Sequence, residues 1–424
     1  SIYQFVEKIE IMNLRINSEF GTLRAVLMHR PGKEIDRLTP YNKEFLLFED
    51  VPYLEALQQE HDAFSNLIKE STGAMVYQLR ELLIRVLYDR EILLKVMRES
   101  LKRSGLSYLA EDILERYSTA ECAGILTAGL KIHELKRKIP NLKPGELLDF
   151  AFAIPPCPNL YFQRDPMALT PGGIIFSSMK MEGRQREADL LRIIFENHPD
   201  FKDHVNTLYP INGHDNPPSI EGGDVIILSH EAVAIGNSER TDEKAIYHTA
   251  KALLAEGAVK RVYEVHLPKK RQYMHLDTVF TVLDENLVLT YPDAMNSVLQ
   301  TSLYTLKEFN GDRVNIKREV LKESLLTVLA REIPHLEILH TGDGNPDYSM
   351  REQWFDGANV FAIGPRRVIS YNRNIHTNRA LRNMGVEVLE IPSSELSRGL
   401  GGPRCMTMPL SLSLIHISEP TRPY

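Results

Sequence analysis

The chain has 424 residues, of which 43% are hydrophobic and 25% are charged, and its formal net charge is −7. This composition is typical of a globular protein with a large core, and the lack of a long basic segment argues against nucleic-acid binding as its main role. Three cysteines are too few for a disulfide framework and favour a reducing compartment, so we expect a cytoplasmic protein. No apolar run reaches the ~18 residues that a membrane-spanning helix needs.

The first part of the chain changes from mixed strand and helix patterns to a purely helical one. Leu23–Met28 and Ala74–Leu79 are predicted to be strands, and a helix is predicted over residues 53–71 between them. Residues 80–145 lack a strand pattern and carry apolar residues at helical spacing, with a capping box at Ser118–Glu121. We therefore predict an all-helical insertion at 80–145, made of about four or five short helices.

From residue 151 onward the sequence predicts four similar units. Each has a hairpin, an amphipathic helix and a further strand, repeated at about 55–80 residues. The two N-terminal strands, the helix between them and a C-terminal strand complete a fifth unit. Units of this kind stack radially, so we predict an α/β propeller of ββαβ repeats formed by residues 13–79 and 146–410.

The two ends of the chain do not fit this repeat. Residues 1–12 and 411–424 are expected to be non-native or disordered, and the second segment resembles translated read-through of an adapter or vector. Neither segment contributes to the predicted fold.

Polar side chains stand close to the points where the predicted hairpins begin. Asp165 precedes the first hairpin, Glu221 the second, and His275 and Asp277 the third, while Cys405 follows the last predicted edge strand in a glycine-rich loop. Taken alone, each has an ordinary explanation as a turn former or a core residue. Because equivalent points of a cyclic repeat converge, we expect these five side chains to line one pocket.

Such a pocket would hold one thiol, one histidine and three carboxylates, without the spacing of a Cys/His zinc site. Buried carboxylates need a cationic partner, and the planar fork of a guanidinium matches two of them. The carboxylates raise the pKa of a thiol, whereas a bound cation favours the nucleophilic thiolate of Cys405. The neighbouring Arg404 would act in the same direction as that cation. His275 is the candidate general acid and base.

These residues lie in stretches that resemble the arginine deiminase family, a member of the guanidino-modifying (pentein) superfamily. The resemblance covers residues 13 to 410, and the matching stretches are 29–34, 38–40, 46–51, 159–166, 221–224, 275–278, 342–344 and 401–409. It implies a five-bladed α/β propeller that needs no metal or cofactor. It also implies hydrolysis of free L-arginine to L-citrulline and ammonia, in arginine catabolism.

The resemblance also implies a role for each residue. Cys405 would attack the guanidinium carbon to give an S-alkylthiouronium intermediate, while Asp165 and Asp277, assisted by Glu221, hold the guanidinium nitrogens. His275 would protonate the departing ammonia and then activate water. The implied substrate-binding residues are Asn159, Arg184 and Arg240 at the α-carboxylate and α-amino end, Phe162 and Leu47 along the aliphatic stem, and Gly399.

Leu400 departs from the family pattern, because many members have a second arginine at this place in the glycine-rich loop. The clamp on the α-carboxylate is therefore predicted to be weaker. The alternatives are another guanidino-modifying enzyme, namely an amidinotransferase or a deiminase of agmatine or methylarginine, and a relative that binds arginine without turnover. A homo-oligomer, dimer or tetramer, is expected, with no nucleic-acid or membrane partner.

Overall fold

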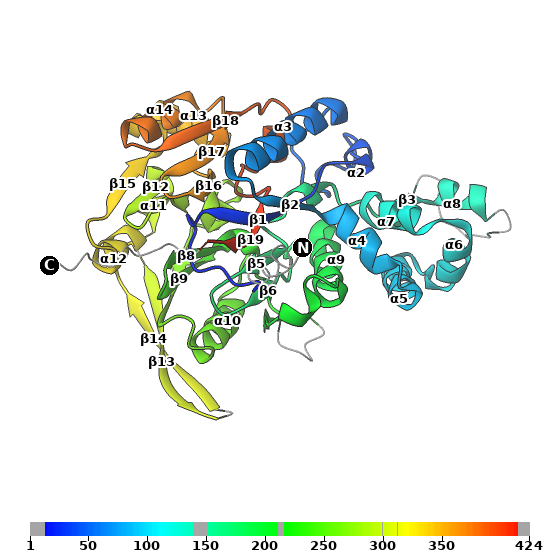
Figure 1. Cartoon of the computed structure of the whole chain (residues 1–424), viewed down its shortest axis with the longest axis horizontal. Helices are drawn as coiled ribbons and strands as arrows, with labels where there is room; N and C mark the ends of the chain where they lie inside the picture. Colours follow the sequence, from blue (N-terminus) through cyan, green and yellow to red (C-terminus); the bar gives the residue numbers. More distant parts are fainter. Residues whose placement is uncertain are drawn as a thin grey trace, which may run out of the picture.

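The computed structural model describes residues 13–139, 142, 151–210, 216–298, 300–311 and 313–413 (Figure 1). Of the predicted end segments 1–12 and 411–424, residues 1–12 and 414–424 lie outside the described residues, as do residues 140, 141 and 143–145 of the predicted insertion. Ser411 and Leu412 are described and belong to strand β19 (Met408–Leu412), so the predicted boundary at residue 410 falls inside a strand.

Four sheets are built on the predicted strand–strand–helix–strand order. In each, the hairpin strands pair antiparallel, and the strand after the helix pairs parallel with the second hairpin strand. Their strands and crossover helices are β5 (Met167–Leu169), β6 (Ile174–Phe176), α9 (Gln185–Asn197) and β7 (Thr207–Tyr209); β8 (Val225–Ser229), β9 (Ala232–Asn237), α10 (Glu243–Ala255) and β10 (Arg261–His266); β11 (Phe280–Val282), β12 (Leu287–Thr290), α12 (Leu325–Glu332) and β15 (Glu337–His340); and β16 (Phe361–Gly364), β17 (Arg367–Tyr371), α14 (Ile375–Asn383) and β18 (Glu387–Ile391).

The fifth unit joins the two ends of the described chain. Strand β1 (Leu23–Met28) lies between β19 and β2 (Met75–Gln78), antiparallel to the first and parallel to the second, and α3 (Leu54–Thr72) connects β1 to β2. The predicted composition of this unit is therefore confirmed. Because β19 follows Cys405 directly, this pairing fixes the glycine-rich loop against the N-terminal unit.

One long hairpin was not predicted from the sequence. Strands β13 (Thr301–Asn310) and β14 (Arg313–Leu321) extend the second sheet beyond β10 and project from the body of the molecule (Figure 1). Most of the β14 side chains are exposed or half-buried, so the strand lacks the alternation of buried and exposed residues that identifies strands. Helix α12 begins at Leu325, after this hairpin.

The insertion contains five α-helices among its described residues. They are α4 (Leu79–Leu87), α5 (Arg90–Leu101), α6 (Ala110–Arg116), α7 (Thr119–Ala128) and α8 (Ile132–Lys138). The predicted capping box at the start of α7 is present, with Ser118 and Glu121 satisfying each other's backbone N–H groups. A short strand pair, β3 (Leu130–Lys131) with β4 (Phe152–Ile154), lies where the insertion rejoins the body. Leu83 and Leu126 share one hydrophobic core with Phe176 and Leu191, so the insertion packs directly on the first hairpin unit.

The loops before the first strands of the five units are hydrogen-bonded to one another in sequence. Each loop contacts the next, and the last contacts the first, so five points far apart in the chain are held together. The bonds run from Gly222 N to Asp165 O (2.7 Å), from Leu276 N to Asp224 Oδ1 (2.8 Å), from Asn359 Nδ2 to Asp277 O (2.9 Å), from Cys405 N to Asn359 Oδ1 (3.0 Å), and from Arg164 N to Cys405 O (3.0 Å).

Within the described ranges, no helix combines the length and the apolar character that crossing a bilayer requires.

Candidate active site

A small buried pocket lies where these loops meet. Its volume is about 20 Å³, room for roughly one water molecule, so side chains at its mouth must move before an amino acid can enter. Nine of the eleven predicted site residues line it; the other two, Glu221 and Asp277, lie behind the lining against His275 and Cys405. The lining residues are Leu47, Asn159, Phe162, Asp165, Arg184, Arg240, Arg271, Met274, His275, Thr278, Gly399, Leu400, Gly401 and Cys405.

Glycines bring the loop before Cys405 close to two buried aromatic rings. A Cβ atom at Gly401 would lie 2.2 Å from Phe162 Cε1, and one at Gly399 would lie 2.0 Å from Tyr161 Oη. Any larger residue at these two positions would displace the loop. The glycine-rich sequence is therefore required for placing the Cys405 thiol inside the pocket.

Two buried aspartates flank the thiol, and each has one oxygen held by an arginine. Asp165 Oδ2 accepts from Arg184 Nη1 at 2.6 Å, and Asp277 Oδ2 accepts from Arg404 Nη1 at 2.8 Å. The second oxygen of each, Oδ1, is buried and accepts no hydrogen bond from any described residue. Buried carboxylate oxygens without donors are costly, so this pair is suited to receive the N–H groups of a planar cation.

His275 is held between two carboxylates. Its Nε2 lies 2.6 Å from Glu221 Oε2, and its Nδ1 lies 3.6 Å from Asp165 Oδ1. Burial alone would lower the pKa of His275, but Asp165 and Glu221 outweigh it and raise this pKa to about 9. Burial would raise the pKa of Glu221, but the hydrogen bond and charge of His275 lower it to about 2. The imidazole therefore carries its proton at neutral pH.

Cys405 is buried, with its Sγ 3.7 Å from Asp277 Oδ2. Burial, followed by the charges of Asp277 and Asp165, raises the pKa of the thiol well above its ordinary value. The expectation that Arg404 would favour the thiolate is wrong, because its guanidinium is turned toward Asp277 and Glu19 (3.0 Å). The resting residue is a thiol, and its activation requires an added positive charge.

The two arginines predicted to bind the α-carboxylate differ in how far their N–H donors are already engaged by the protein. Arg184 is an ion-pair partner of Asp165 and also donates to Glu187 Oε2 at 2.8 Å. Arg240 lies farther from its nearest buried acid, with Nη1 3.7 Å from Glu221 Oε2, and its buried Nε has no hydrogen-bond partner among the described residues. Arg240 therefore has an unused donor, whereas Arg184 mainly fixes Asp165 in place.

The chain was compared with known proteins. A family model described as arginine deiminase matches residues 44–411. The arginine deiminase of Listeria welshimeri is 39% identical over 404 residues, which cover 94% of this chain and 98% of the relative. The arginine deiminase of Latilactobacillus sakei is 36% identical over 409 residues, with 94% and 98% covered.

The chain belongs to the arginine deiminase family.

Solved structures of low sequence identity share its α/β fold, which is of the pentein type. The N-terminal domain of ArgZ, a cyanobacterial arginine dihydrolase bound to its product, has a TM-score of 0.53 at 14% identity, over 92% of this chain and 97% of that chain. A DDAH mutant from Pseudomonas aeruginosa in complex with citrulline has a TM-score of 0.50 at 15% identity, over 91% and 99%. At this identity the likeness concerns the fold alone.

Three residues of this arginine deiminase family site were not predicted from the sequence. Arg271 and Met274 line the pocket, and Arg271 Nη2 forms a 2.6 Å ion pair with Glu49 Oε1 in the loop that carries Leu47. A signal for Arg271 existed, because it ends a short basic cluster four residues before His275. The third residue is Asp356.

Asp356 is buried and interacts electrostatically with Asp277 and Asp165 of the site. Burial, followed by the charges of Asp277 and Asp165, raises the pKa of this carboxyl to about 8. Asp356 also adopts a left-handed turn conformation, with φ 55°, so this residue is both a turn former and a buried acid. Asp343, which shares the Gly/Asn-rich setting, is exposed.

Two leucines at the pocket share an uncommon backbone conformation. Leu47 has φ 63° and Leu400 has φ 57°, in the left-handed region that residues with a Cβ rarely adopt. Leu400 lines the pocket with an apolar side chain where many arginine deiminases have an arginine. Backbone strain of this kind persists where a surrounding structure fixes it, often at functional loops.

No group of three or more His, Cys, Asp or Glu side chains in the part of the chain that is described has the arrangement of a metal site.

Proposed function

We propose that this chain is an arginine deiminase that hydrolyses free L-arginine to L-citrulline and ammonia in arginine catabolism. The observation that carries the proposal is the pair of buried Oδ1 atoms of Asp165 and Asp277, which accept no hydrogen bond from any described residue and lie beside His275 and Cys405. A guanidinium group supplies N–H donors to both oxygens and a positive charge beside the thiol. Its neutral product, a ureido group, does not supply that charge.

Substrate binding activates the nucleophile in this proposal. The guanidinium charge offsets the carboxylates that keep the pKa of Cys405 high, so the thiol releases its proton to solvent and the thiolate forms in the complex. Arg240 is the main partner of the α-carboxylate, because it has an unused donor, and Arg184 is a second partner that also fixes Asp165. The remaining positioning contacts come from Asn159, Phe162, Leu47 and Gly399 at the pocket wall.

The chemistry then proceeds in two steps. Cys405 Sγ forms a bond to the guanidinium carbon, the bond from that carbon to a terminal nitrogen breaks, and the protonated His275 gives its proton to the departing ammonia. The neutral imidazole next takes a proton from water, whose oxygen adds to the S-alkylthiouronium carbon. The C–S bond breaks, the departing thiolate takes up the surplus proton of the product hydroxyl, and L-citrulline is released.

The main alternative is another guanidino-modifying enzyme, an amidinotransferase or a deiminase of agmatine or methylarginine. A substrate panel tests it: the protein is incubated separately with L-arginine, agmatine and methylarginine, and citrulline and ammonia are quantified. We expect equimolar citrulline and ammonia from L-arginine, and much slower turnover of agmatine, which lacks the carboxylate that Arg240 meets. Preferred turnover of agmatine or methylarginine, or amidino transfer without ammonia, would replace the proposal by the alternative.

We also propose that the five units close into a five-bladed propeller. The support is the series of hydrogen bonds that links the five loops and returns from the last loop to the first. Radial closure leaves few exposed sheet edges, which explains why the first and last strands meet in one sheet.

We further propose a cytoplasmic homo-oligomer, dimer or tetramer, that acts without a nucleic-acid partner. The projecting hairpin β13–β14 supports self-association, because its Leu306 and Phe309 are exposed and a two-stranded arm is only marginally stable in water alone. Light scattering of the wild type and of Phe309→Glu tests this assembly. We expect an oligomer from the wild type and smaller species from the variant.

A further inference from the structure

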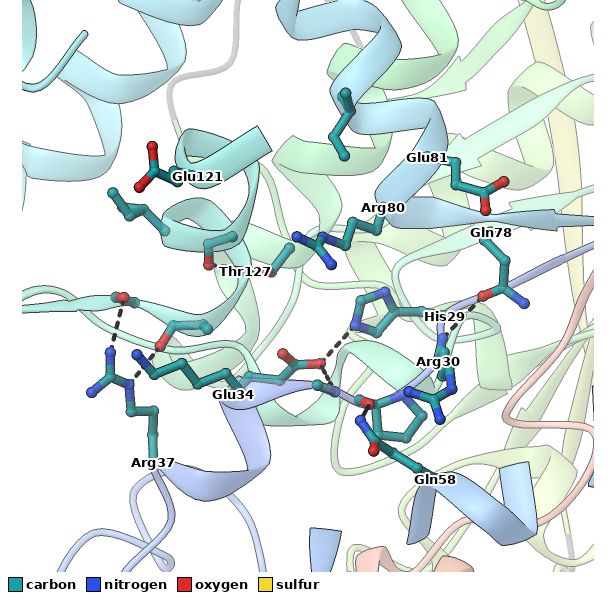
Figure 2. A pocket seen from close by; sticks show the side chains of 18 of the residues that line it. His29, Arg30, Glu34, Arg37, Gln58, Gln78, Arg80, Glu81, Glu121 and Thr127 are labelled. Atoms are coloured by element: carbon teal, nitrogen blue, oxygen red, sulfur yellow. Dashed lines mark hydrogen bonds and ion pairs between the residues drawn. The ribbon is translucent and has the colours of Figure 1, made fainter. Parts of the chain in front are cut away.

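A second, much larger cavity lies between the helical insertion and the body of the molecule (Figure 2). Its volume is about 980 Å³, and its lining comes from α3, α4, α7, α8, the short helix α2 (Lys33–Asp36) and the turn after β1. It shares no lining residue with the pocket around Cys405. The stretch His29–Glu34, which the sequence singled out, lines this cleft and has no part in the catalytic pocket.

Most acidic side chains of this cleft are already engaged. Glu34 accepts from His29, Asp62 from Arg30, Glu121 from Ser118 and Glu134 from Arg37; for the fifth, Glu81, no hydrogen bond or ion pair occurs among the described residues. The cleft is lined by seven basic residues, which outnumber these acids: Arg30, Lys33, Arg37, Lys69, Arg80, Arg137 and Lys138.

Two of the arginines have unused guanidinium groups. They are Arg80, in the first turn of α4, and Arg137, in α8. Neither forms a hydrogen bond or ion pair with any residue that the structure describes. Figure 2 shows the Arg80 guanidinium reaching into the open space between Thr127 and His29. Planar donor forks that face a cavity without a carboxylate partner are suited to an oxyanion.

Two independent features also favour negative charge at this point. Helix α4 has nine residues, and its N-cap residue Gln78 makes no side-chain capping bond; the amide oxygen of Gln78 accepts instead from Arg30 N at 3.1 Å. The first N–H groups of the helix are thus not capped by Gln78, and the first-turn acid Glu81 also lines the cleft. His29 is 3% exposed and its Nε2 is held by Glu34 at 2.7 Å; its buried Nδ1 has no hydrogen-bond partner among the described residues and donates to an anion when both ring nitrogens carry protons.

We propose that this cleft binds the phosphate group of a small phosphorylated molecule, with Arg80 and Arg137 as its principal contacts. A phosphate accepts several charge-assisted hydrogen bonds and matches the arginine fork bidentately. The volume is in the range of pockets that enclose whole metabolites rather than a single ion. The site lies between the insertion and the turn after β1, and β1 is the central strand of the sheet that also contains β19.

Isothermal titration calorimetry of the full chain with inorganic pyrophosphate, at low ionic strength, tests the proposal. We expect saturable binding to the wild type, weakened by about tenfold or more in Arg80→Gln and in Arg137→Gln. The matched control is Arg85→Gln, which removes the same charge from an exposed position of the same helix outside the cleft. It should bind as the wild type does. Circular dichroism confirms that each variant is folded.

A fourth variant, Arg240→Gln, distinguishes the cleft from the catalytic pocket. Pyrophosphate binding should be unchanged in this variant, because Arg240 lies outside the cleft. The proposal is overturned if the wild type shows no saturable binding, if Arg240→Gln or Arg85→Gln weakens binding as much as the cleft variants do, or if both cleft variants bind like the wild type.

Discussion

The catalytic pocket and the insertion cleft are suited to ligands of opposite charge. In both, the preference comes from charged groups that the protein itself leaves without a hydrogen-bond partner. In the pocket, of about 20 Å³, the groups left without partners are carboxylate oxygens of Asp165 and Asp277. In the cleft, of about 980 Å³, they include the guanidinium groups of Arg80 and Arg137 and one carboxylate, that of Glu81. The formal net charge of −7 predicts neither preference. What decides the ligand is which ions remain unpaired after the protein has formed its own hydrogen bonds.

The two sites also differ in how strongly solvent weakens their contacts. The acids of the pocket and its Arg184 and Arg240 are buried, whereas Arg80 and Arg137 of the cleft are exposed. Charge interactions are far stronger where water is excluded, and exposed ones are screened by salt. Substitutions in the pocket should therefore have much larger effects than substitutions in the cleft.

The largest effect is expected from Asp277→Asn. This change removes the negative charge beside Cys405 and leaves the buried Arg404 with Glu19 as its remaining carboxylate partner. We expect kcat/KM for L-arginine to fall by about 10³-fold or more, in steady-state citrulline assays. The control is Asp343→Asn, an exposed loop aspartate that should behave as the wild type does. A loss below about tenfold would argue against a guanidinium-binding role for Asp277.

Arg240→Gln should have a smaller and more selective effect. Its unused donor is assigned to the α-carboxylate, so KM for L-arginine should rise by about 10- to 100-fold, with less change in kcat. Whatever slow turnover of agmatine the wild type shows should persist in this variant. The control is Arg192→Gln, which removes only a surface pair with Glu196. Equal losses for both substrates would contradict the assignment.

The pH dependence of stability should report the buried His275–Glu221 pair. Because the pKa of His275 is raised to about 9, the folded state holds this proton more tightly than the unfolded state does. The resulting stabilisation is present below pH 6.5 and is lost as pH rises through 9. Because the pKa of Glu221 is lowered to about 2, its contribution is present above pH 4.5 and is lost as pH falls toward 2.

Denaturant unfolding of the wild type and Glu221→Gln across this range measures the effect. The variant lacks one of the acids that raise the pKa of His275, so its stability should fall less steeply between pH 6.5 and 9. Identical slopes would mean that Glu221 does not hold the imidazole proton.

A rise in ionic strength is expected to change KM for L-arginine only slightly. It should weaken ligand binding in the cleft much more, which separates the two sites clearly. Raising the ionic strength from about 0.01 M to about 0.15 M shortens the screening length from about 30 Å to about 8 Å. Pyrophosphate binding to the cleft should weaken several-fold, while KM for L-arginine changes by less than about threefold, because its charged partners are buried. Equal salt dependence would remove the distinction between the sites.

Much of the fold and the site could be predicted, because the evidence for them is local. The strand–helix order of the five units follows from hydrophobic periodicity, and Asp165, His275 and Cys405 stand next to predicted strand starts. The hairpin β13–β14 was missed because few of its outer side chains are buried, so no alternation marks it.

The charge pairing inside the site could not be predicted, because it is set by tertiary contacts. Arg404 is a neighbour of Cys405 in sequence, yet it pairs with Asp277, 127 residues away. Asp356 was ambiguous for another reason: a turn-forming aspartate and a buried acid have the same local sequence. The insertion cleft is formed by several separate segments, and no single one of them indicates a cavity.

The most direct test is citrulline production from L-arginine by the wild type, Cys405→Ala and Cys122→Ala. Cys122 is a buried cysteine of the insertion and serves as the matched control. The proposed mechanism predicts citrulline from the wild type and from folded Cys122→Ala, and none above background from folded Cys405→Ala. Undiminished turnover by Cys405→Ala, or no citrulline from the wild type, would contradict it.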